Sequence, residues 1–310
     1  MKEFIIGIDA GGTKTRACAY GIDSSTPIAE AVTGCGNPAS TGESAIAEIV
    51  RAAEEICTSL DGFCLFAAIG AAGSSAQIDG RPAREILTEQ LRALPCMKNA
   101  GIEILPDAEL SLYANFDPAP DAASAIVISG TGSAVFAFSG ENIVRAGGWG
   151  NILGDGGSGY HVGLLFLRHL TGLLDRGEQI PPDLLPPVLS QCGDLRPGIV
   201  DLVYRQPKSA VAALAPHVVS LCESWKTARQ ILTESASALA DDTECIFRRS
   251  PQTNRNLAYT GGFITHCERF REAFVTELNR RIPGISVQPA ADPTLGVIRL
   301  YRRCKEKNYD

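Results

Sequence analysis

FIIGIDAGGTK, residues 4–14, is an apolar run that ends in a glycine-rich turn, and AIVISGTGS, residues 125–133, has the same pattern. A β-branched run that ends in glycine and threonine predicts a strand whose end leaves backbone N–H groups uncovered. Successive uncovered N–H groups bind phosphate oxygens. The two turns together therefore predict two half-sites for the phosphates of one nucleoside triphosphate.

Neither turn fits the better-known phosphate motifs. In the first turn Thr13 precedes Lys14, whereas Walker A requires Gly-Lys followed by Ser or Thr. The second turn lacks the third glycine of the dinucleotide fingerprint, and an apolar run at 135–138 follows it instead of a helix. Both turns are thus expected to join two strands. This layout resembles that of actin-like, Hsp70-like and sugar-kinase ATPases, in which two lobes face each other across a cleft.

Length and composition indicate a globular protein of two domains. The chain has 310 residues, of which 45% are hydrophobic and 20% charged, and its net charge is −7. That charge argues against nucleic acid or an anionic membrane as a partner, so local groups must hold an anionic nucleotide. No apolar stretch approaches the roughly 18 residues of a membrane span, and the chain opens with a strand instead of a signal peptide. We expect a cytoplasmic protein.

The cysteines and histidines show no metal-binding pattern. No pair of cysteines has C-x-x-C spacing, and the four histidines are dispersed. Several cysteines lie in apolar runs, where cysteine acts as a small hydrophobic residue. We therefore expect no zinc site, and we expect all ten cysteines to be reduced, at positions 18, 35, 57, 64, 96, 192, 222, 245, 267 and 304.

The order of predicted elements gives the fold class. We predict an α/β protein of two actin-like (ribonuclease H-like) lobes with an interlobe ATP cleft. The N-terminal lobe, 1–118, has strands at 4–9, 15–20, 27–33, 64–69 and 102–105 and helices at 44–60 and 81–94. The C-terminal lobe, 119–310, repeats the opening hairpin and carries an inserted segment near 176–225. Asp117 to Asp121, with two prolines, is the expected hinge. A basic amphipathic helix at 293–306 could pack back on the N-terminal lobe.

Two helices carry the sequence signature of a capping box. Ser40 and Glu43 precede the helix at 44–60, and Thr265 and Glu268 stand at the start of the last helix but one. In such a pair, each side chain bonds the other residue's backbone N–H. We therefore expect Ser40 and Thr265 to cap these helices.

Two aspartates follow strands and are candidates for chemistry. Asp107 ends a strand just before a helix, where open sheets present reactive groups, and could act as general base toward a hydroxyl. It could equally be a helix N-cap. Asp9 directly precedes the first turn and is expected to face the metal–phosphate region, holding Mg²⁺ through water, or else to bond its own turn. Lys14 could reach a phosphate or remain solvated.

The remaining nucleotide-binding candidates are backbone positions. A strand followed by Gly261-Gly262 and a helix leaves room for an adenosine against the backbone. Hydroxyl and amide groups of the two threonines in the turns would add to the phosphate sites. The full set of ATP and phosphate candidates is Asp9, Gly11, Gly12, Thr13, Lys14, Gly130, Thr131, Gly132, Gly261 and Gly262.

A glycine-dense segment supplies candidates for a second ligand. Residues 147–160 contain seven glycines and one tryptophan, which favours a tightly folded backbone over a flexible linker. Asp155 could accept hydrogen bonds from sugar hydroxyls, with Gly148 and Trp149 as a wall of the pocket, or it could cap a turn. Asn37 could bind a polar ligand, but it could also be an ordinary Asn-Pro turn residue.

These motifs, in order, resemble a known family. GIDAGGTKT, GNPAS, LPDAELSLYANF, VISGTGS, GGWGNILGDGGSGY, YTGGF and PTLGVIRL are similar to the N-acetylglucosamine kinases and the wider BadF/BadG/BcrA/BcrD-type ATPases of the actin-like superfamily. The resemblance implies Asp107 as the base and an adenosine site at Gly261-Gly262. It also implies sugar contacts from Asn37, Ser133 and Asp155. The family usually has an acidic residue where this chain has Gly156, so the identity of the sugar stays open.

The resemblance implies an ATP-dependent kinase that phosphorylates a hydroxyl of an amino sugar, with the 6-hydroxyl of N-acetylglucosamine as first choice. ATP and Mg²⁺ would be the cofactors, and a homodimer is suggested. One alternative is an ATPase activator of a radical dehydratase, although the stretch between Met97 and Gln191 lacks the cysteines of an iron–sulfur site. Another is a sugar or nucleotide sensor without turnover. The zinc loop and E-x-G-H site of ROK sugar kinases are absent.

Overall fold

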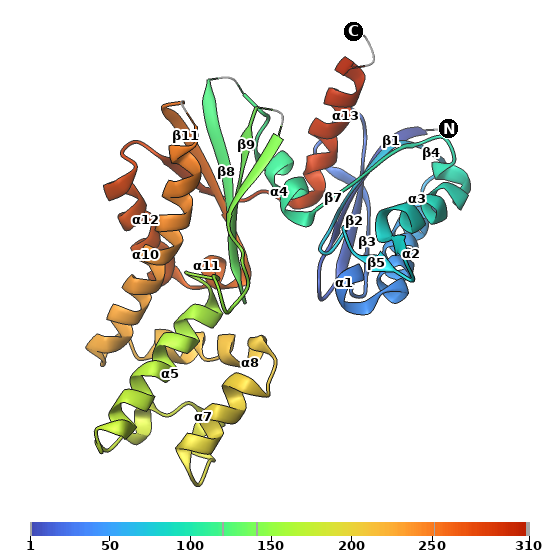
Figure 1. The fold of residues 1–310 in the computed structure, drawn as a ribbon. Coiled ribbons are helices and arrows are strands. Elements are labelled where there is room, and N and C mark those ends of the chain that lie inside the picture. The colour runs from blue at the N-terminus through green and yellow to red at the C-terminus, as the bar shows by residue number, and fades with distance from the viewer. Residues whose placement is uncertain (1, 120, 141, 251, 308–310) are drawn as a thin grey trace. The chain divides into compact units, whose positions relative to one another are not determined.

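The computed structural model describes residues 2–119, 121–140, 142–250 and 252–307 (Figure 1). The chain divides into two compact units: unit 1 runs to Asp117 and resumes at Ala290, and unit 2 is Pro118–Pro289. The division falls one residue before the expected boundary after residue 118, and the terminal segment belongs to unit 1. Pro120, one of the two prolines of the expected hinge, lies outside the described residues.

The sheet of unit 1 brings three strand ends to one edge. Its strands lie in the order β3-β2-β1-β4-β7, where β1, β4 and β7 are parallel to one another. β2 pairs antiparallel with both β1 and β3, so β3, β2 and β1 form a meander. The carboxyl ends of the parallel strands therefore meet at one edge. The bounds are β1 Lys2–Ala10, β2 Thr15–Tyr20, β3 Pro27–Thr33, β4 Gly62–Ala71 and β7 Gly101–Leu105, with a small separate hairpin of β5 Gln77–Ile78 and β6 Arg81–Pro82.

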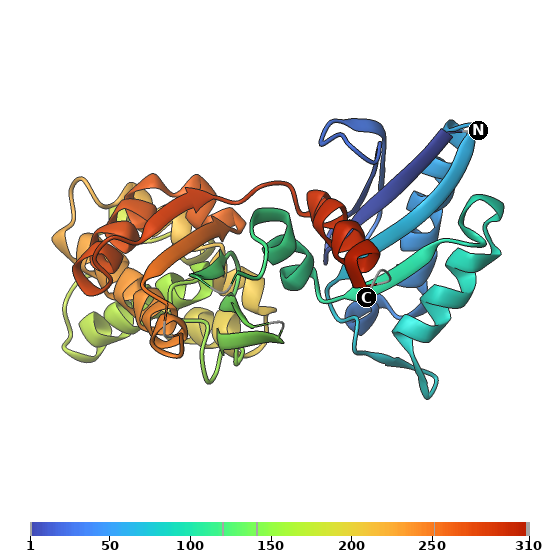
Figure 2. The ribbon, with the colours of Figure 1, turned by 90° about the horizontal axis from the view of Figure 1, so that it is seen from above.

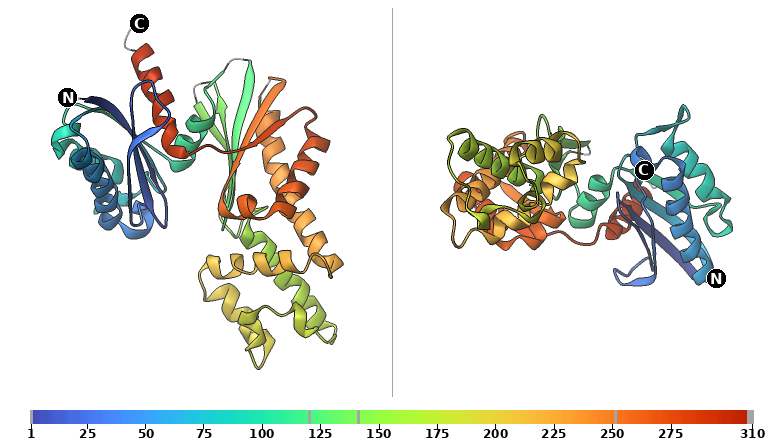
Figure 3. Two further views of the ribbon diagram at one scale, coloured as in Figure 1. Left: turned by 180° about the vertical axis from the view of Figure 1, so that it is seen from behind. Right: turned by 90° about the horizontal axis from the view of Figure 1, so that it is seen from below.

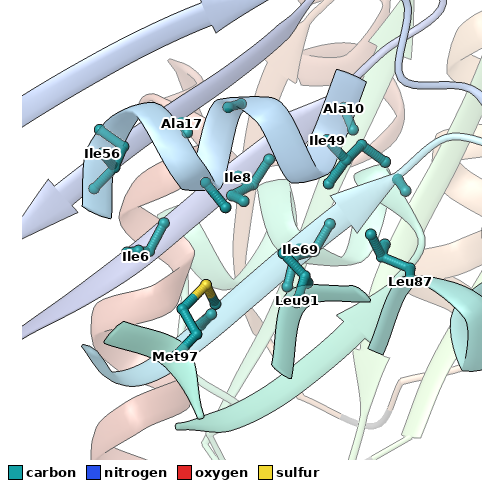
Figure 4. Close-up of a cluster of buried hydrophobic side chains, with 14 of the residues drawn as sticks. Ile6, Ile8, Ala10, Ala17, Ile49, Ile56, Ile69, Leu87, Leu91 and Met97 are labelled. Carbon is teal, nitrogen blue, oxygen red and sulfur yellow. The ribbon is translucent and has the colours of Figure 1, made fainter. Parts of the chain in front are cut away.

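Helices cover both faces of this sheet (Figure 2). The helices α2 (Glu43–Ser59) and α3 (Ala83–Ala93) pack on one face with the short η1 (Pro95–Met97). Alternate β1 side chains point into this layer, so Ile6 and Ile8 meet Ile49, Ile56, Leu87 and Leu91 (Figure 4). The opposite face receives α4 (Asp107–Asn115) and α13 (Gly296–Lys307).

The terminal segment packs on the rest of unit 1 at two glycines where a side chain would clash. A Cβ on Gly7 of β1 would lie 2.0 Å from the carbonyl oxygen of Thr294, in the short η3 (Pro293–Leu295). A Cβ on Gly296 would lie 2.5 Å from the carbonyl oxygen of Leu110 in α4. The Tyr20 hydroxyl also lies 2.6 Å from the Thr294 hydroxyl in a buried hydrogen bond. These contacts explain why the last helix belongs to unit 1.

Unit 2 has a second sheet with the same arrangement of strands. Its order is β10-β9-β8-β11-β12, in which β8, β11 and β12 are parallel and β9 and β10 form the antiparallel meander. The predicted α/β fold of two similar lobes is thus confirmed. The long helices α10 (Lys226–Arg248) and α12 (Glu268–Arg281) share a core with this sheet. The strands are β8 Ala122–Ser129, β9 Ser133–Ser139, β10 Asn142–Gly147, β11 Asn254–Thr260 and β12 Ser286–Pro289.

Short helices fill residues 176–225, the segment expected as an insertion and here called the helical insertion. Together with α5 (Gly159–Asp175) and the first turns of α10 they enclose a separate apolar core. Figure 3 shows these helices gathered at one end of the unit 2 sheet. They are η2 Pro182–Leu184, α6 Pro187–Ser190, α7 Leu195–Tyr204, α8 Lys208–Ala212 and α9 Ala215–Ser220, and the short α11 Gly262–His266 follows β11.

The structure corrects the expectation that all cysteines are reduced. Cys57, at the end of α2, and Cys96, in η1, form a disulfide with a Cα–Cα distance of 6.0 Å. Their separation of 39 residues matches no short motif, and only the packing of η1 beside α2 brings them together. The other eight cysteines form no disulfide in the part of the chain that the structure describes.

Both expected capping boxes are wrong. Gly42 stands at the N-cap of α2, while Ser40 lies inside the preceding short helix α1 (Pro38–Thr41) and donates to the Asn37 carbonyl. Cys267 stands at the N-cap of α12, because α11 already occupies the residues around Thr265. In each case a short helix precedes the long one, and the residue expected to cap the long helix lies inside the short helix.

Among the described residues, no helix is both long and apolar enough to cross a membrane. The same part of the chain holds no group of three or more His, Cys, Asp or Glu side chains arranged to bind a metal ion.

Candidate active site

The first glycine turn joins β1 to β2 and leaves its tip open. The Gly11 N–H donates to the Lys14 carbonyl at 3.0 Å, which closes the turn. Within the described chain, the N–H groups of Gly12 and Thr13 have no backbone acceptor outside the strand ladders, and both residues are exposed. A Cβ on Gly12 would meet no atom within 4 Å. This tip can therefore receive an anion on its N–H groups.

Asp9 and Asp107 lie at the same edge of the unit 1 sheet. Gly70, near the end of β4, pairs with Asp9 on one side and with Leu105 on the other. A Cβ on Gly70 would come within 3.2 Å of the Asp107 Cα atom, so this glycine lets α4 begin close to the sheet. The chain thus places a carboxylate on each side of Gly70.

Burial raises the pKa values of both of these carboxyls. The pKa of Asp9 is raised to about 6, chiefly by burial and next by the negative charge of Asp107, while Lys14 and Arg16 oppose the shift. Burial also raises the pKa of Asp107, against the lowering effect of the Ala108 N–H, which donates to Asp107 Oδ1 at 2.9 Å. Pro106 occupies the N-cap position of α4, so Asp107 is its first residue and not its cap.

Asn37 is the N-cap of α1, next to the first turn. Its Oδ1 accepts the Ala39 N–H at 3.0 Å, and a Cβ on Gly73 would lie 2.5 Å from this oxygen. The Gly36 N–H donates to the Gly11 carbonyl at 2.9 Å and ties this loop to the phosphate turn. Asn37 therefore serves as a capping residue, while its side-chain NH₂ is not used in that role.

The second glycine turn, between β8 and β9, is braced from below by α5. The Gly159 N–H donates to the Gly130 carbonyl at 2.8 Å, and the Tyr160 N–H donates to the Thr131 carbonyl at 3.3 Å. The Ser129 hydroxyl donates to the Gly157 carbonyl at 2.6 Å. The glycine-dense segment thus holds the carbonyls of Gly130 and Thr131, and the Gly130 N–H donates to the Gly132 carbonyl at 2.9 Å. In the described chain the N–H groups of Thr131 and Gly132 have no backbone acceptor outside the strand ladders.

Asp155 is a buried carboxylate beside this turn. Its φ of +60° is unusual for a residue other than glycine, and its exposed fraction is only 3%. The Ser133 N–H donates to Asp155 Oδ1 at 3.2 Å, whereas Oδ2 accepts no hydrogen bond in the described chain. Lys208 Nζ lies 3.7 Å from Oδ2. A buried carboxylate oxygen without a donor is costly, so Oδ2 can accept a hydrogen bond from a ligand.

A cavity of about 630 Å³ opens next to the second turn. Gly130, Thr131 and Gly262 line it together with Gly159 of α5. Its other walls are mostly apolar and come from the helical insertion and α11, namely Ser209, Ala212, Ala213, Ala215, Pro216, Val219, Phe263, His266 and Cys267. A mostly apolar cavity beside uncovered N–H groups suits a nucleoside with its phosphates.

The two glycines after β11 have different surroundings. Gly261 has a φ of +104°, and a Cβ there would lie 2.4 Å from the Ser129 carbonyl oxygen. Gly262 begins α11, and a Cβ there would meet no atom within 4 Å. Gly261 is therefore required by the backbone, whereas Gly262 keeps space open in the cavity.

Trp149 does not line this cavity. Its exposed fraction is 67%, and the Arg145 guanidinium lies over its ring at 5.4 Å. Gly148, with a φ of +67°, approaches Ala134 so closely that a Cβ would lie 2.9 Å from the alanine methyl. Ser133 is buried, and its hydroxyl donates to the Gly156 carbonyl at 2.7 Å. The four residues of unit 2 that were predicted to bind the sugar thus lie in or near the start of β9; they are Ser133, Gly148, Trp149 and Asp155.

Sequence reasoning missed Lys208 and Ser209. Both belong to α8 in the helical insertion, where no motif stands out from the surrounding prolines and apolar residues. The fold brings Lys208 to Asp155 and Ser209 to the cavity wall. Nothing in the residues next to Lys208 indicates that it lies at a binding site.

Two characterised kinases are similar to this chain over nearly its whole length. The chain is 27% identical over 303 residues to an N-acetylmuramic acid/N-acetylglucosamine kinase of Clostridium acetobutylicum, covering 92% of this chain and 93% of that protein. It is 28% identical over 334 residues to an N-acetyl-D-glucosamine kinase of Dictyostelium discoideum, covering 98% and 99%.

A solved structure has the same fold. It is a putative N-acetylglucosamine kinase from Chromobacterium violaceum, with a TM-score of 0.72, 22% identity and coverage of 96% of this chain and 99% of that one. The model of the BadF/BadG/BcrA/BcrD ATPase family matches residues 6–298, nearly the whole described chain. The chain therefore belongs to the BadF/BadG/BcrA/BcrD ATPase family.

Proposed function

We propose that the protein is an ATP-dependent kinase that transfers the γ-phosphate of ATP to a hydroxyl of an amino sugar, with Asp107 as the general base. The first choice of acceptor is the 6-hydroxyl of N-acetylglucosamine. The two curated relatives are named as kinases of N-acetylglucosamine, and one also of N-acetylmuramic acid. The observation that carries the proposal is the pair of carboxylates, Asp9 and Asp107, beside a phosphate-binding turn.

The nucleotide would be held mainly by unit 2. Its adenosine fits the cavity lined by Gly130, Thr131 and Gly262, since one wall is open backbone and the others are mostly apolar. The N–H groups of Thr131 and Gly132 would bind phosphate oxygens. The matching N–H groups of Gly12 and Thr13 in unit 1 supply the second phosphate site of the proposal.

Asp107 has the properties of a general base for an alcohol. Burial raises its pKa, and a more basic carboxylate accepts a hydroxyl proton more readily. In the proposed step the sugar oxygen attacks the γ-phosphorus in line while its proton passes to Asp107. The bond between the γ-phosphorus and the bridging oxygen breaks, and ADP leaves. The uncovered N–H groups of the turns would stabilise charge on the transferred phosphoryl group.

The residues of unit 1 fit a bound Mg²⁺. Asp9 and Asp107 raise each other's energy when both are ionised, and a divalent cation near them would relieve that repulsion. Mg²⁺ keeps several waters and binds through one or two carboxylates and substrate phosphates. Asp9 would hold the ion through water, and the ion would neutralise phosphate charge.

The sugar would be bound by polar groups that the fold leaves available. Asp155 Oδ2 lacks a hydrogen-bond donor and can accept one from a sugar hydroxyl. The Asn37 NH₂ and the Ser133 hydroxyl can add contacts. Gly148 and Trp149 would form the side of the sugar site in this proposal, since Trp149 keeps an exposed ring.

A screen of ADP release tests the proposal. Purified protein with Mg²⁺ and ATP is assayed with glucosamine, N-acetylglucosamine, N-acetylmuramic acid, N-acetylmannosamine and glucose. We expect turnover to depend on an amino sugar, and the product of N-acetylglucosamine to carry phosphate on the 6-oxygen by NMR. Absence of stimulation by every sugar would overturn the kinase proposal.

A further inference from the structure

We propose that Lys208, in the helical insertion, is a phosphate-binding residue that contacts the phosphate chain of the nucleotide. The inference rests on the proposed nucleotide site in unit 2. It assigns to the insertion a direct part in binding ATP, in addition to forming the cavity wall.

Lys208 lies between Asp155 and the wall of the cavity. Its ammonium lies 3.7 Å from the buried Oδ2 of Asp155, and Asp155 accepts the N–H of Ser133, at the end of the second turn. The next residue, Ser209, lines the cavity together with Gly130 and Thr131. The lysine therefore stands at the junction of the cavity and the phosphate-binding turn.

If the second turn is to bind phosphate, the carboxylate of Asp155 beside it calls for a nearby positive charge. A Cβ on Gly132 would lie 2.9 Å from both carboxylate oxygens, so a negative charge sits directly under the turn that is to receive phosphates. Such a carboxylate would repel an anionic ligand unless a positive charge offsets it. Lys208 supplies that charge, and it matters more in a chain of net charge −7.

The ammonium of Lys208 still has donors for a ligand. Its distance to Asp155 Oδ2 exceeds that of a hydrogen bond, and its side chain is 48% exposed while that of Asp155 is 4% exposed. A lysine ammonium has three donors on a flexible stem and binds phosphate as a point charge. Lys208 can therefore face Asp155 and bind phosphate oxygens at the same time.

Binding measurements on three variants test this role. Lys208→Met removes the charge, Lys208→Arg keeps it, and Lys226→Met removes an exposed lysine at the start of α10 as a matched control. The dissociation constants of Mg²⁺–ATP and of AMP are measured by calorimetry without sugar. We expect Lys208→Met to weaken ATP roughly 10-fold, as for one charged hydrogen bond, and AMP less than about 2-fold. Lys208→Arg should recover most of the loss, and Lys226→Met should bind both nucleotides as the wild type does.

Three other outcomes would overturn the assignment. Equal losses for ATP and AMP would mean that Lys208 supports the cavity and not the phosphates. A rise in the KM of the sugar alone would place the lysine at the sugar, and unchanged binding would make it a solvated residue. Wild-type protein that binds ATP without phosphorylating any sugar would overturn the kinase proposal and leave this one standing.

Discussion

The two glycine turns have similar sequences and the same place in two similar sheets, but their surroundings differ. The first turn is exposed at its tip, and its neighbours are the carboxylates Asp9 and Asp107. The second turn is held by α5 through the carbonyls of Gly130 and Thr131 and borders an apolar cavity. In the proposed function, the first turn therefore belongs to the reacting groups and the second to nucleotide binding.

The largest effect is expected at the first turn, from Asp107→Asn. The amide keeps the shape of the side chain but cannot take up a proton, so kcat should fall about 10³-fold. The dissociation constant of ATP should change little, because the proposed nucleotide site lies at the second turn. Stopped-assay turnover and calorimetry on the same preparation measure both quantities. If Asp107→Asn kept wild-type turnover, Asp107 would not be the base.

The next effect is expected at the second turn, from a pair of neighbouring glycines. In Gly262→Leu the new side chain enters open space in the cavity, so ATP should bind about 100-fold more weakly while folding stays intact, a loss of about 2.7 kcal/mol. Gly261→Ala forces a Cβ against the Ser129 carbonyl at a φ of +104° and should lower the free energy of unfolding by about 2 kcal/mol or more.

Denaturant melts and nucleotide titrations separate the two variants. The cavity would lose its assignment as the nucleotide site if Gly262→Leu bound ATP normally. A fully stable Gly261→Ala protein would show that the backbone can relax around Ser129.

A smaller effect concerns the stability of the first turn as pH changes. The folded pKa of Asp9 is about 6, above the value near 3.8 of a free aspartate, so the folded state binds more protons than the unfolded state between these values. Stability contributed by Asp9 is therefore present below about pH 4 and is lost as pH rises through about 6. Asp9→Asn should thus be more stable than the wild type by of order 1 kcal/mol at pH 7.5, and the gain should vanish near pH 4.

Melts in EDTA from pH 4 to pH 8 check this difference, because bound Mg²⁺ would favour ionised Asp9. If Asp9→Asn stabilised the protein equally at every pH, ionisation of Asp9 would not be what destabilises the wild type. Asp23, an exposed aspartate in the loop after β2, offers a control substitution.

The sequence was sufficient to predict the fold because each glycine turn follows an apolar, β-branched strand that is buried along most of its length. The sequence also predicted where Asp9 and Asp107 lie, because an apolar run followed by a glycine turn or a proline marks the end of a strand. The capping boxes failed because Ser40 and Thr265 lie in short helices that periodicity does not resolve. Lys208 and the Cys57–Cys96 pair depend on contacts between distant segments, and no local pattern encodes those contacts.

The smallest effect is expected from Lys14, the lysine of the first turn, and it is compared with the effect of Lys208 at the second. Lys14 is exposed on the first turn and lowers the pKa of Asp9, so its charge acts mainly on the carboxylates. Lys208 stands beside the second turn, at the proposed nucleotide site. Lys14→Met should therefore weaken ATP by less than about 3-fold, within the range of an exposed charge, whereas Lys208→Met weakens it roughly 10-fold. Titrations of both variants with Mg²⁺–ATP give the ratio, and a larger loss from Lys14→Met would mean that the first turn fixes the nucleotide.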